Sequence, residues 1–274
     1  MSVVTFWGNG KVETAQTTSL AGIATQLTVE HNYKILLINT KHNDPTLEEC
    51  FWKQTTGMKQ TDLETGITGL IKAISSNKAT PEVITNYTRA VFKDRLEVLT
   101  DGNILRDTYE KQKVYMKNII KIAKKAYDLV FVDLDGSIEE PFVQEVIGES
   151  SLVVVSITQR EKIIKELINI QQTNNLLNKN NAMFLMGRYD RNSKFNTKNV
   201  ERTYRVKDIV GIPYNTLFFE SANEGGLADF FTQYRKLKPT HPQANLVNSM
   251  EEFSEKMIYR LKELQMQNQM QTQM

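Results

Sequence analysis

The chain has 274 residues, of which 40% are apolar and 24% charged, and its formal net charge is +2 at pH 7. These values are typical of a globular protein with a full hydrophobic core, and the near-neutral charge argues against a strong attraction to nucleic acid. The single cysteine, Cys50, excludes a disulfide framework, and no apolar run reaches the ~18 residues that cross a bilayer, so we expect a cytoplasmic protein with at most a peripheral place at a membrane.

The N-terminal segment predicts a strand, a glycine-containing loop and a helix. Residues 3–6 form an apolar run typical of a buried strand, and apolar residues recur at helical spacing between residues 20 and 27. In a doubly wound fold, backbone N–H groups and a helix N-terminus converge on a phosphate at this place. The loop nevertheless lacks the pattern G-x-x-x-x-G-K-[ST] in every register, because Gln16 stands where the phosphate-binding lysine belongs.

The rest of the chain alternates between strand-like and helix-like segments. Apolar runs predict further strands at residues 33–38, 96–99, 129–132, 152–157, 182–186 and 208–213. Helical spacing predicts helices at residues 65–74, 104–126, 141–147 and 161–177, and Thr80-Pro81 predicts the start of another. The expected fold class is therefore α/β: a doubly wound, mostly parallel sheet with helices on both faces.

The C-terminal segment predicts a long helix at residues 245–267. Its apolar stripe favours core packing over a membrane-surface helix, because acids as well as bases lie on the polar face. The glutamine- and methionine-rich tail is of low complexity, and we expect it to fray. We predict one α/β domain at residues 1–240, followed by the C-terminal helix and tail at residues 241–274.

Four chemistry-bearing segments follow one another in a fixed order. They are the loop K-V-E-T-A-Q-T-T at residues 11–18, the strand that ends in Asp133, the strand before Thr158-Gln159, and residues 211–226, G-I-P-Y-N to E-S-A-N-E-G-G. In this order they resemble the ParA/MinD-type ATPases, whose deviant Walker A pattern is K-G-G-x-G-K-T-T. The resemblance covers residues 2–235 and implies a P-loop NTPase-like fold, ATP and Mg²⁺ as ligands, and a homodimer. Because the loop is eroded, the chain is most similar to the TadZ/CpaE-like branch, which positions pilus and secretion machinery.

The resemblance implies roles for the residues that this chain retains. Lys11 matches a lysine that reaches the nucleotide of the partner subunit, and Thr17, followed by Thr18, matches the hydroxyl that ligates Mg²⁺. Asp133 matches the Walker B carboxylate, and Pro213 matches a proline near the base. The expected nucleotide-binding residues are Lys11, Glu13, Thr14, Ala15, Gln16, Thr17, Thr18, Asp133 and Pro213, with Thr17 as a magnesium ligand when nucleotide binds.

Several positions depart from the family pattern. Gln16, a neutral donor, replaces the in-subunit lysine, and a Glu13 carboxylate directed into the phosphate nest would repel a triphosphate or occupy the anion site itself. Asn39-Thr40-Lys41 replaces the aspartates that orient the attacking water, and Asp44 could substitute only if its loop folds back. Gly187 replaces the asparagine that reads adenine. We assign no catalytic residue.

Each retained residue also has a structural interpretation. Thr17 and Thr18 could cap the first helix, Asp133 could pair with a lysine, and Lys11 could be a solvated surface charge. Cys50 is expected to be a partly buried thiol without a function. Together, at matching spacing, the residues favour a site derived from a nucleotide site.

Three functions remain open. The first is a degenerate ParA/MinD-like positioning or assembly factor with weak or absent ATP hydrolysis, acting as a homodimer with protein partners of a membrane-associated pilus or secretion machine. The second is an active but divergent ATPase with nucleotide-dependent dimerisation, in which Lys11 acts across the dimer and Asp44 or another acid orients the water. The third, a DNA-partition ATPase, is disfavoured because no basic stripe with interleaved aromatic residues is present.

Overall fold

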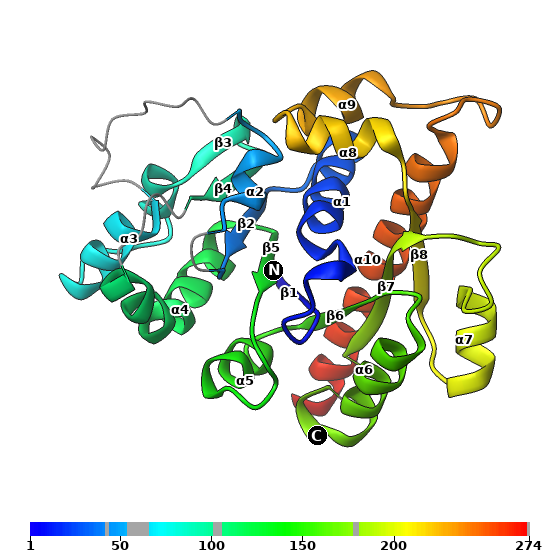
Figure 1. Ribbon diagram of the computed structural model, residues 1–274. Helices are drawn as coiled ribbons and strands as arrows, with labels where there is room; N and C mark the ends of the chain where they lie inside the picture. Colours follow the sequence, from blue (N-terminus) through cyan, green and yellow to red (C-terminus); the bar gives the residue numbers. More distant parts are fainter. Residues whose placement is uncertain (42–43, 54–65, 101–105, 178–180, 273–274) are drawn as a thin grey trace.

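The computed structural model describes residues 1–41, 44–53, 66–100, 106–177 and 181–272, which form an eight-stranded sheet between two layers of helices (Figure 1). The strands lie in the order β3-β4-β2-β5-β1-β6-β7-β8, and every neighbouring pair is parallel except β3 and β4. Their bounds are β1 (Ser2–Trp7), β2 (Ile35–Asn39), β3 (Arg89–Phe92), β4 (Leu96–Leu99), β5 (Leu129–Leu134), β6 (Leu152–Ile157), β7 (Ala182–Tyr189) and β8 (Ile209–Pro213). The predicted α/β fold class is confirmed.

The central strands are buried along their whole length rather than on alternate residues, because helices cover both faces of the sheet. The helices are α1 (Gln16–Glu30), α2 (Thr46–Glu49), α3 (Gly66–Ser75), α4 (Arg106–Ala126), α5 (Pro141–Gly148), α6 (Glu161–Thr173), α7 (Thr197–Tyr204), α8 (Thr216–Asn223), α9 (Leu227–Gln233) and α10 (Ala244–Thr272). One apolar cluster joins the sheet to α3, α4, α5, α6 and α7, and a second joins it to α1, α2, α8, α9 and α10. These two clusters are the two halves of the core.

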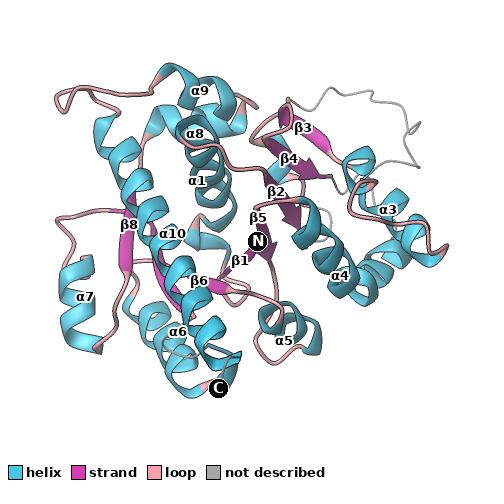
Figure 2. Ribbon diagram, turned by 180° about the vertical axis from the view of Figure 1, so that it is seen from behind, coloured by secondary structure: helices cyan, strands magenta, loops and turns pink. Residues whose placement is uncertain are grey.

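The C-terminal helix belongs to the second cluster. Leu246, Met250, Phe253, Met257 and Leu261 of α10 are buried on the face of the sheet that α1 also covers (Figure 2). A Cβ atom on Gly22 of α1 would lie 2.8 Å from Met250 Cε, so this glycine permits the close approach of the two helices. The predicted core packing is confirmed; the helix extends to Thr272, and the fraying of the tail stays a prediction.

One prediction is wrong at one edge of the sheet, and one strand there was not predicted. The segment after Thr80-Pro81 forms a turn and the short 3-10 helix η2 (Ile84–Tyr87), in which only Ile84 is buried. A short segment that buries so little apolar surface has too little packing to hold an α-helix. The strand β3 was not predicted because it is short, partly exposed and antiparallel, so it carries no buried apolar run. Residues 54–65 and 101–105, which include the expected starts of two helices, lie outside the described residues.

Smaller differences concern the helices. The helix predicted at residues 161–177 ends at Thr173, since Asn174 is extended and the chain continues as the 3-10 helix η3 (Asn175–Leu177). Helices α2, α7, α8 and α9, each of eight residues or fewer, were not predicted. Among the described residues, no helix is both long enough and apolar enough to cross a bilayer.

Cys50 is more deeply buried than expected. Its side chain is 1% exposed at the end of α2, and its thiol donates to the Thr46 carbonyl at 3.2 Å. Burial raises the pKa of the Cys50 thiol, and the nearby Asp133 carboxylate raises it further. A neutral buried thiol is a poor nucleophile, so Cys50 contributes packing.

Candidate functional site

The carboxyl ends of β1, β2 and β5 meet at the centre of the sheet, and the fully buried Asp133 lies at this point. Parallel pairing places Asp133 beside Phe6 of β1 and Asn39 of β2. In an open α/β sheet, this edge is where ligands bind. The sheet therefore fixes the position of the Asp133 carboxylate, and neighbouring groups must compensate its buried negative charge.

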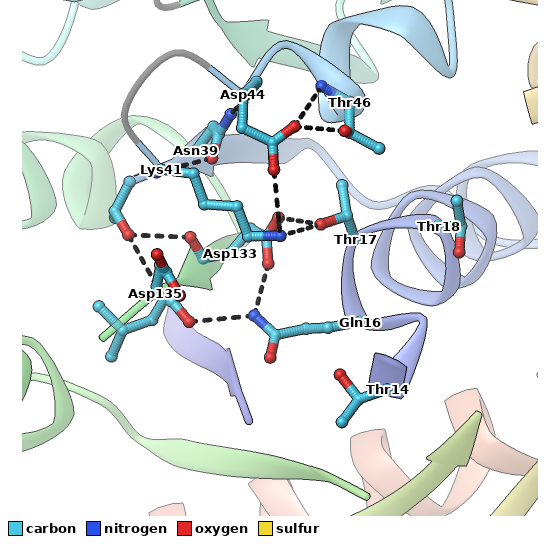
Figure 3. A network of polar contacts seen from close by, with 12 residues as sticks. Thr14, Gln16, Thr17, Thr18, Asn39, Lys41, Asp44, Thr46, Asp133 and Asp135 are labelled. Carbon is cyan, nitrogen blue, oxygen red and sulfur yellow. Dashed lines mark hydrogen bonds and ion pairs between the residues drawn. The ribbon is translucent and has the colours of Figure 1, made fainter. Parts of the chain in front are cut away.

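Gln16 and Thr17, in the first turn of α1, both bind Asp133 (Figure 3). Gln16 Nε2 donates to Asp133 Oδ1 at 2.6 Å and to the carbonyl oxygens of Phe6 and Leu134, each at 3.0 Å. Thr17 Oγ1 donates to Asp133 Oδ2 at 2.5 Å. The amide that replaces the family's in-subunit lysine thus joins α1 to the ends of β1 and β5, and its donor is already used within the protein.

The positive charge in this cluster comes from Lys41, which follows β2. Lys41 Nζ lies 3.2 Å from Asp133 Oδ2, donates to Thr17 Oγ1 and lies 3.9 Å from Asp44 Oδ2. Burial by itself would lower the pKa of Lys41, but the Asp133 and Asp44 carboxylates outweigh burial, so this pKa lies above its ordinary value. The structural interpretation of Asp133, pairing with a lysine, is confirmed.

The loop after β2 folds back on itself and holds Lys41 in place. The Asn39 side chain donates to the Asp44 carbonyl at 2.7 Å and accepts from the Lys41 main-chain N–H at 2.9 Å. Asp44 accepts from the main-chain N–H and the hydroxyl of Thr46. The condition on Asp44, that its loop folds back, is therefore met, but its carboxylate is already hydrogen-bonded to Thr46.

The loop before α1 leaves the start of that helix open. Ala15 adopts the left-handed conformation at φ 53°, and among the described residues no side chain caps the first turn. Thr17 and Thr18 lie inside α1, where Thr18 Oγ1 donates to the Ala15 carbonyl and Thr17 bonds to Asp133. The interpretation of these two threonines as helix caps is wrong, and the first N–H groups of α1 remain available to an anion.

Lys11 and Glu13 each pair with a residue on or beside α6. Lys11 Nζ lies 3.0 Å from Glu166 Oε1, so Lys11 is not a free surface charge. The Glu13 carboxylate accepts from Arg160 Nη1 at 2.6 and 2.7 Å on the exposed surface. Glu13 therefore points away from the phosphate nest and neither repels an anion there nor occupies its site.

Gly187 has a packing explanation. A Cβ atom at this position would lie 2.1 Å from the carbonyl oxygen of Thr14, because the 3-10 helix η1 (Val12–Thr14) packs directly on β7. No side chain, including the asparagine of the family, fits here without moving the loop. The backbone of β7 next to Gly187 is part of the wall behind the phosphate loop.

These elements surround a pocket of about 350 Å³, within the size range of small-molecule sites. The loop before α1, α1 itself and the segments after β2 and β5 contribute Gly10, Lys11, Thr14, Ala15, Gln16, Thr17, Thr18, Ser19, Lys41, Asp44, Thr46 and Asp135, and β7 contributes Arg188 next to the end of β8. The end of β8 and the segment through α8 contribute Ile212, Pro213, Tyr214, Asn215, Phe218, Phe219 and Asn223. The charged lining residues are three cations and two acids, and two of the cations, Lys11 and Lys41, are paired with Glu166 and Asp133.

Most residues predicted from the sequence lie at this pocket. Lys11, Thr14, Ala15, Gln16, Thr17, Thr18 and Pro213 line it, Asp133 is buried directly behind them, and Glu13 lies outside it. The prediction missed Lys41 as a partner of Asp133, and it missed Arg188, Tyr214 and Phe219 in the lining. Lys41 carried a signal, since it is a cation two residues beyond the end of a central parallel strand.

The sequence matches no protein-family model and no curated protein sequence. Solved structures do match, among them a ParA family ATPase from Chlorobium tepidum, with a TM-score of 0.71 and 14% identity over 92% of this chain and 98% of that one. The chain shares the fold of the ParA and MinD ATPases. The septum site-determining protein MinD of Pyrococcus horikoshii, complexed with Mg-ADP, matches with a TM-score of 0.67 and 16% identity over 94% and 98%. The MinC:MinD complex of Aquifex aeolicus matches with a TM-score of 0.65 and 15% identity over 94% and 96%.

The residues of the pocket fit a nucleotide better than they fit a magnesium ion. The open N-terminus of α1 and the cations at one end suit phosphate, and the aromatic and apolar residues at the other end suit a base. Thr17 and Asp133, which the family resemblance assigns to magnesium, already bind the ammonium group of Lys41. At an effective dielectric of about 20, a unit and a divalent positive charge about 4 Å apart repel each other by about 8 kcal/mol. Magnesium therefore does not fit beside Thr17 while Lys41 is there.

Proposed function

We propose that this chain is a ParA/MinD-type protein that binds a nucleotide, hydrolyses ATP weakly or not at all, and acts as a positioning or assembly factor. The observation that carries the proposal is the polar cluster at Asp133, in which Gln16, Thr17 and Lys41 satisfy one another in place of a hydrolytic centre. The fold shared with ParA and MinD ATPases supports the ParA/MinD-type part of the proposal.

Nucleotide binding is supported by the pocket. Its cationic end lies at the open N-terminus of α1, and Pro213 and Tyr214 lie at the opposite end. The similar MinD of Pyrococcus horikoshii is complexed with Mg-ADP. By analogy, the phosphates of a nucleotide would lie against Ala15 to Ser19, with the base towards the end of β8.

Weak hydrolysis is supported by the side chains after β2. Phosphoryl transfer to water needs a group that orients the attacking water. Asn39 and Lys41 supply no carboxylate, and the Asn39 side chain is used in holding its own loop. ATP bound in this pocket would therefore be hydrolysed slowly or not at all.

The partner and location of the protein are proposed by analogy with similar proteins. We propose a homodimer in the cytoplasm, with protein partners in a membrane-associated machine such as a pilus or secretion system, as in the TadZ/CpaE-like branch. The similar MinD of Aquifex aeolicus is in a complex with MinC. In such a role, the bound nucleotide would stabilise one form of the protein rather than supply energy.

One observation favours the second candidate, an active but divergent ATPase. The loop after β2 folds back, so that Asp44 lines the pocket and lies 3.9 Å from Lys41. In this alternative, Asp44 leaves Thr46 and orients the water, and Lys11 acts across a dimer.

Calorimetric titration with ATP and Mg²⁺, together with an assay of phosphate release, distinguishes these candidates. The proposal predicts binding, phosphate release no faster than that of the Lys11→Ala variant, and an affinity about tenfold higher in Gln16→Lys, which restores a cation to the loop. Magnesium-dependent turnover that disappears in Lys11→Ala and in Asp44→Asn would establish the second candidate instead. If ATP does not bind at all, the nucleotide-binding proposal is wrong.

A further inference from the structure

The ammonium group of Lys41 has a defined position and one free direction. Of its three N–H donors, one is directed at Thr17 Oγ1 and one at Asp133 Oδ2. The distance of 3.9 Å to Asp44 Oδ2 is too long for a hydrogen bond, so the third donor is not fully used. Lys41 also lines the pocket, with 18% of its side chain exposed. One N–H of a fixed cation is thus available to a ligand oxygen.

Hydrogen bonds of Asn39 and Thr40 hold the main chain on either side of Lys41 in the absence of a ligand. Two hydrogen bonds of the Asn39 side chain bind the residues on either side of the turn, at 2.7 and 2.9 Å. Thr40 Oγ1 donates to the Asp133 carbonyl at 3.0 Å and accepts from the Asp135 N–H at 3.1 Å, which attaches the same loop to the end of β5. A cation held in this way loses little conformational freedom when a phosphate binds.

We propose that Lys41 is a built-in cation that takes the place of Mg²⁺, so that this pocket binds the phosphates of a nucleotide in their metal-free form. This inference rests on the proposed nucleotide-binding function. It explains why Thr17 and Asp133 are both present although the hydrolytic carboxylates are absent. The two oxygen atoms that would serve a metal serve the lysine.

A triphosphate without magnesium carries more negative charge than its magnesium complex, so the other charges of the lining matter. Besides Lys41, the lining holds Arg188 and Lys11, and Lys11 is already paired with Glu166. Asp133 is balanced by Lys41, and Asp44 and Asp135 are the acids that remain at the rim. Among the described residues, no group of three or more His, Cys, Asp or Glu side chains is arranged to hold a metal ion.

The decisive experiment titrates the wild-type chain with ATP by calorimetry, once with excess EDTA and once with Mg²⁺. The expected result is an affinity in EDTA that equals or exceeds the affinity in Mg²⁺. Binding that needs Mg²⁺ would overturn this inference and leave the proposed function intact, because it would mean that Lys41 moves aside for the metal. Absence of binding in both buffers would overturn the proposed function itself. The comparison requires no variant, so it does not depend on the folding of one.

Variants then test Lys41 directly. Lys41→Gln, which removes the charge but keeps a long polar side chain, is expected to weaken binding in EDTA by about tenfold to a hundredfold. The same variant is expected to bind more tightly when Mg²⁺ is added, since the metal can then reach Thr17 and Asp133. The matched control is Lys256→Gln on α10, whose lysine is ion-paired to Glu252 away from this pocket and should change neither affinity. Equal affinities of Lys41→Gln and the wild-type chain in EDTA would overturn the role of Lys41.

Discussion

The end of the pocket beside β1, β2 and α1 consists of polar side chains that bond to one another, whereas the end beside β8 and α8 presents aromatic side chains to solvent. Gln16, Thr17 and Lys41 all use donors on Asp133. Tyr214 and Phe219, by contrast, are 56% and 39% exposed, and their ring centroids are 6.2 Å apart. A ligand must fit around an existing polar network at the end beside α1. At the end beside β8 and α8, it can make new contacts with exposed aromatic side chains.

Removing the carboxylate at the centre of the polar end should have the largest effect. Asp133→Ala leaves the Lys41 ammonium group and the Gln16 amide without their partner, so we expect the free energy of unfolding in urea to fall by about 3 kcal/mol. Asp135→Ala, two residues further along the chain and exposed, is the control and should change it by less than about 0.5 kcal/mol. Similar losses in both variants would mean that the polar end does not depend on Asp133.

A substitution of Gly187, where η1 packs on β7, should have the next largest effect on stability. Gly187→Ala places a methyl group 2.1 Å from the Thr14 carbonyl oxygen and must displace η1 or β7, so we expect a loss of stability of about 2 kcal/mol in thermal or urea unfolding. ATP affinity should fall with it, because Ala15 and the start of α1 move. In Gly148→Ala, the control, the new Cβ meets no atom within 4 Å, and stability should stay the same or rise slightly. An unchanged Gly187→Ala protein would refute the close packing of η1 on β7.

A smaller effect, on ATP affinity, is expected for a substitution at the end of the pocket beside β8 and α8. Tyr214→Ala is expected to lower the affinity for ATP about fivefold, because a stacking partner is lost, and to leave the affinity for inorganic triphosphate unchanged. Tyr259→Ala on α10 removes a tyrosine that is also largely exposed and should change neither affinity. If both ligands weaken equally in Tyr214→Ala, the aromatic end does not hold the base.

The smallest effect concerns the ion pair of Lys11 with Glu166. Burial acts to raise the pKa of Glu166, but hydrogen bonds from Lys11 and Asn9 and the charge of Lys11 outweigh it, so the pKa lies below its ordinary value of 4.5. A lowered pKa stabilises the fold above pH 4.5, and this contribution is lost as the pH falls through the pKa of the folded state. The wild-type chain should therefore exceed Glu166→Gln in unfolding free energy by about 0.5 kcal/mol or less at pH 6, and the difference should shrink at pH 3. A difference that grows towards low pH would contradict the sign of the shift.

Much of the fold could be predicted because buried parallel strands are nearly continuous apolar runs. Residues 96–99 and 152–157 were predicted with the observed bounds, and the other parallel strands differ by a few residues at their ends. The exceptions were elements with weak apolar signals, such as the exposed edge strand β3 and the short helices α7, α8 and α9. Their conformations depend on neighbours rather than on a periodicity of their own.

The candidate site could be located from the sequence but not fully described. Thr17 and Asp133 were expected in one site because both match positions of the ParA/MinD-type nucleotide site. The partners of the charged side chains were not predictable. Glu13 pairs with Arg160, 147 residues further along the chain, and not with an anion in the nest.

The sequence by itself determined the order of the buried strands and of the longer helices, and the absence of the family pattern's lysine from the loop before α1 and of its carboxylates from the segment after β2. Apolar periodicity and residue type are properties of short stretches of sequence, so they can be read without knowing the tertiary contacts. Only the tertiary structure decided which cation balances Asp133, because Lys41 is a long side chain whose position depends on the folding back of its loop. That contact changes the expected chemistry of the site, since a lysine lies where a magnesium ion was predicted.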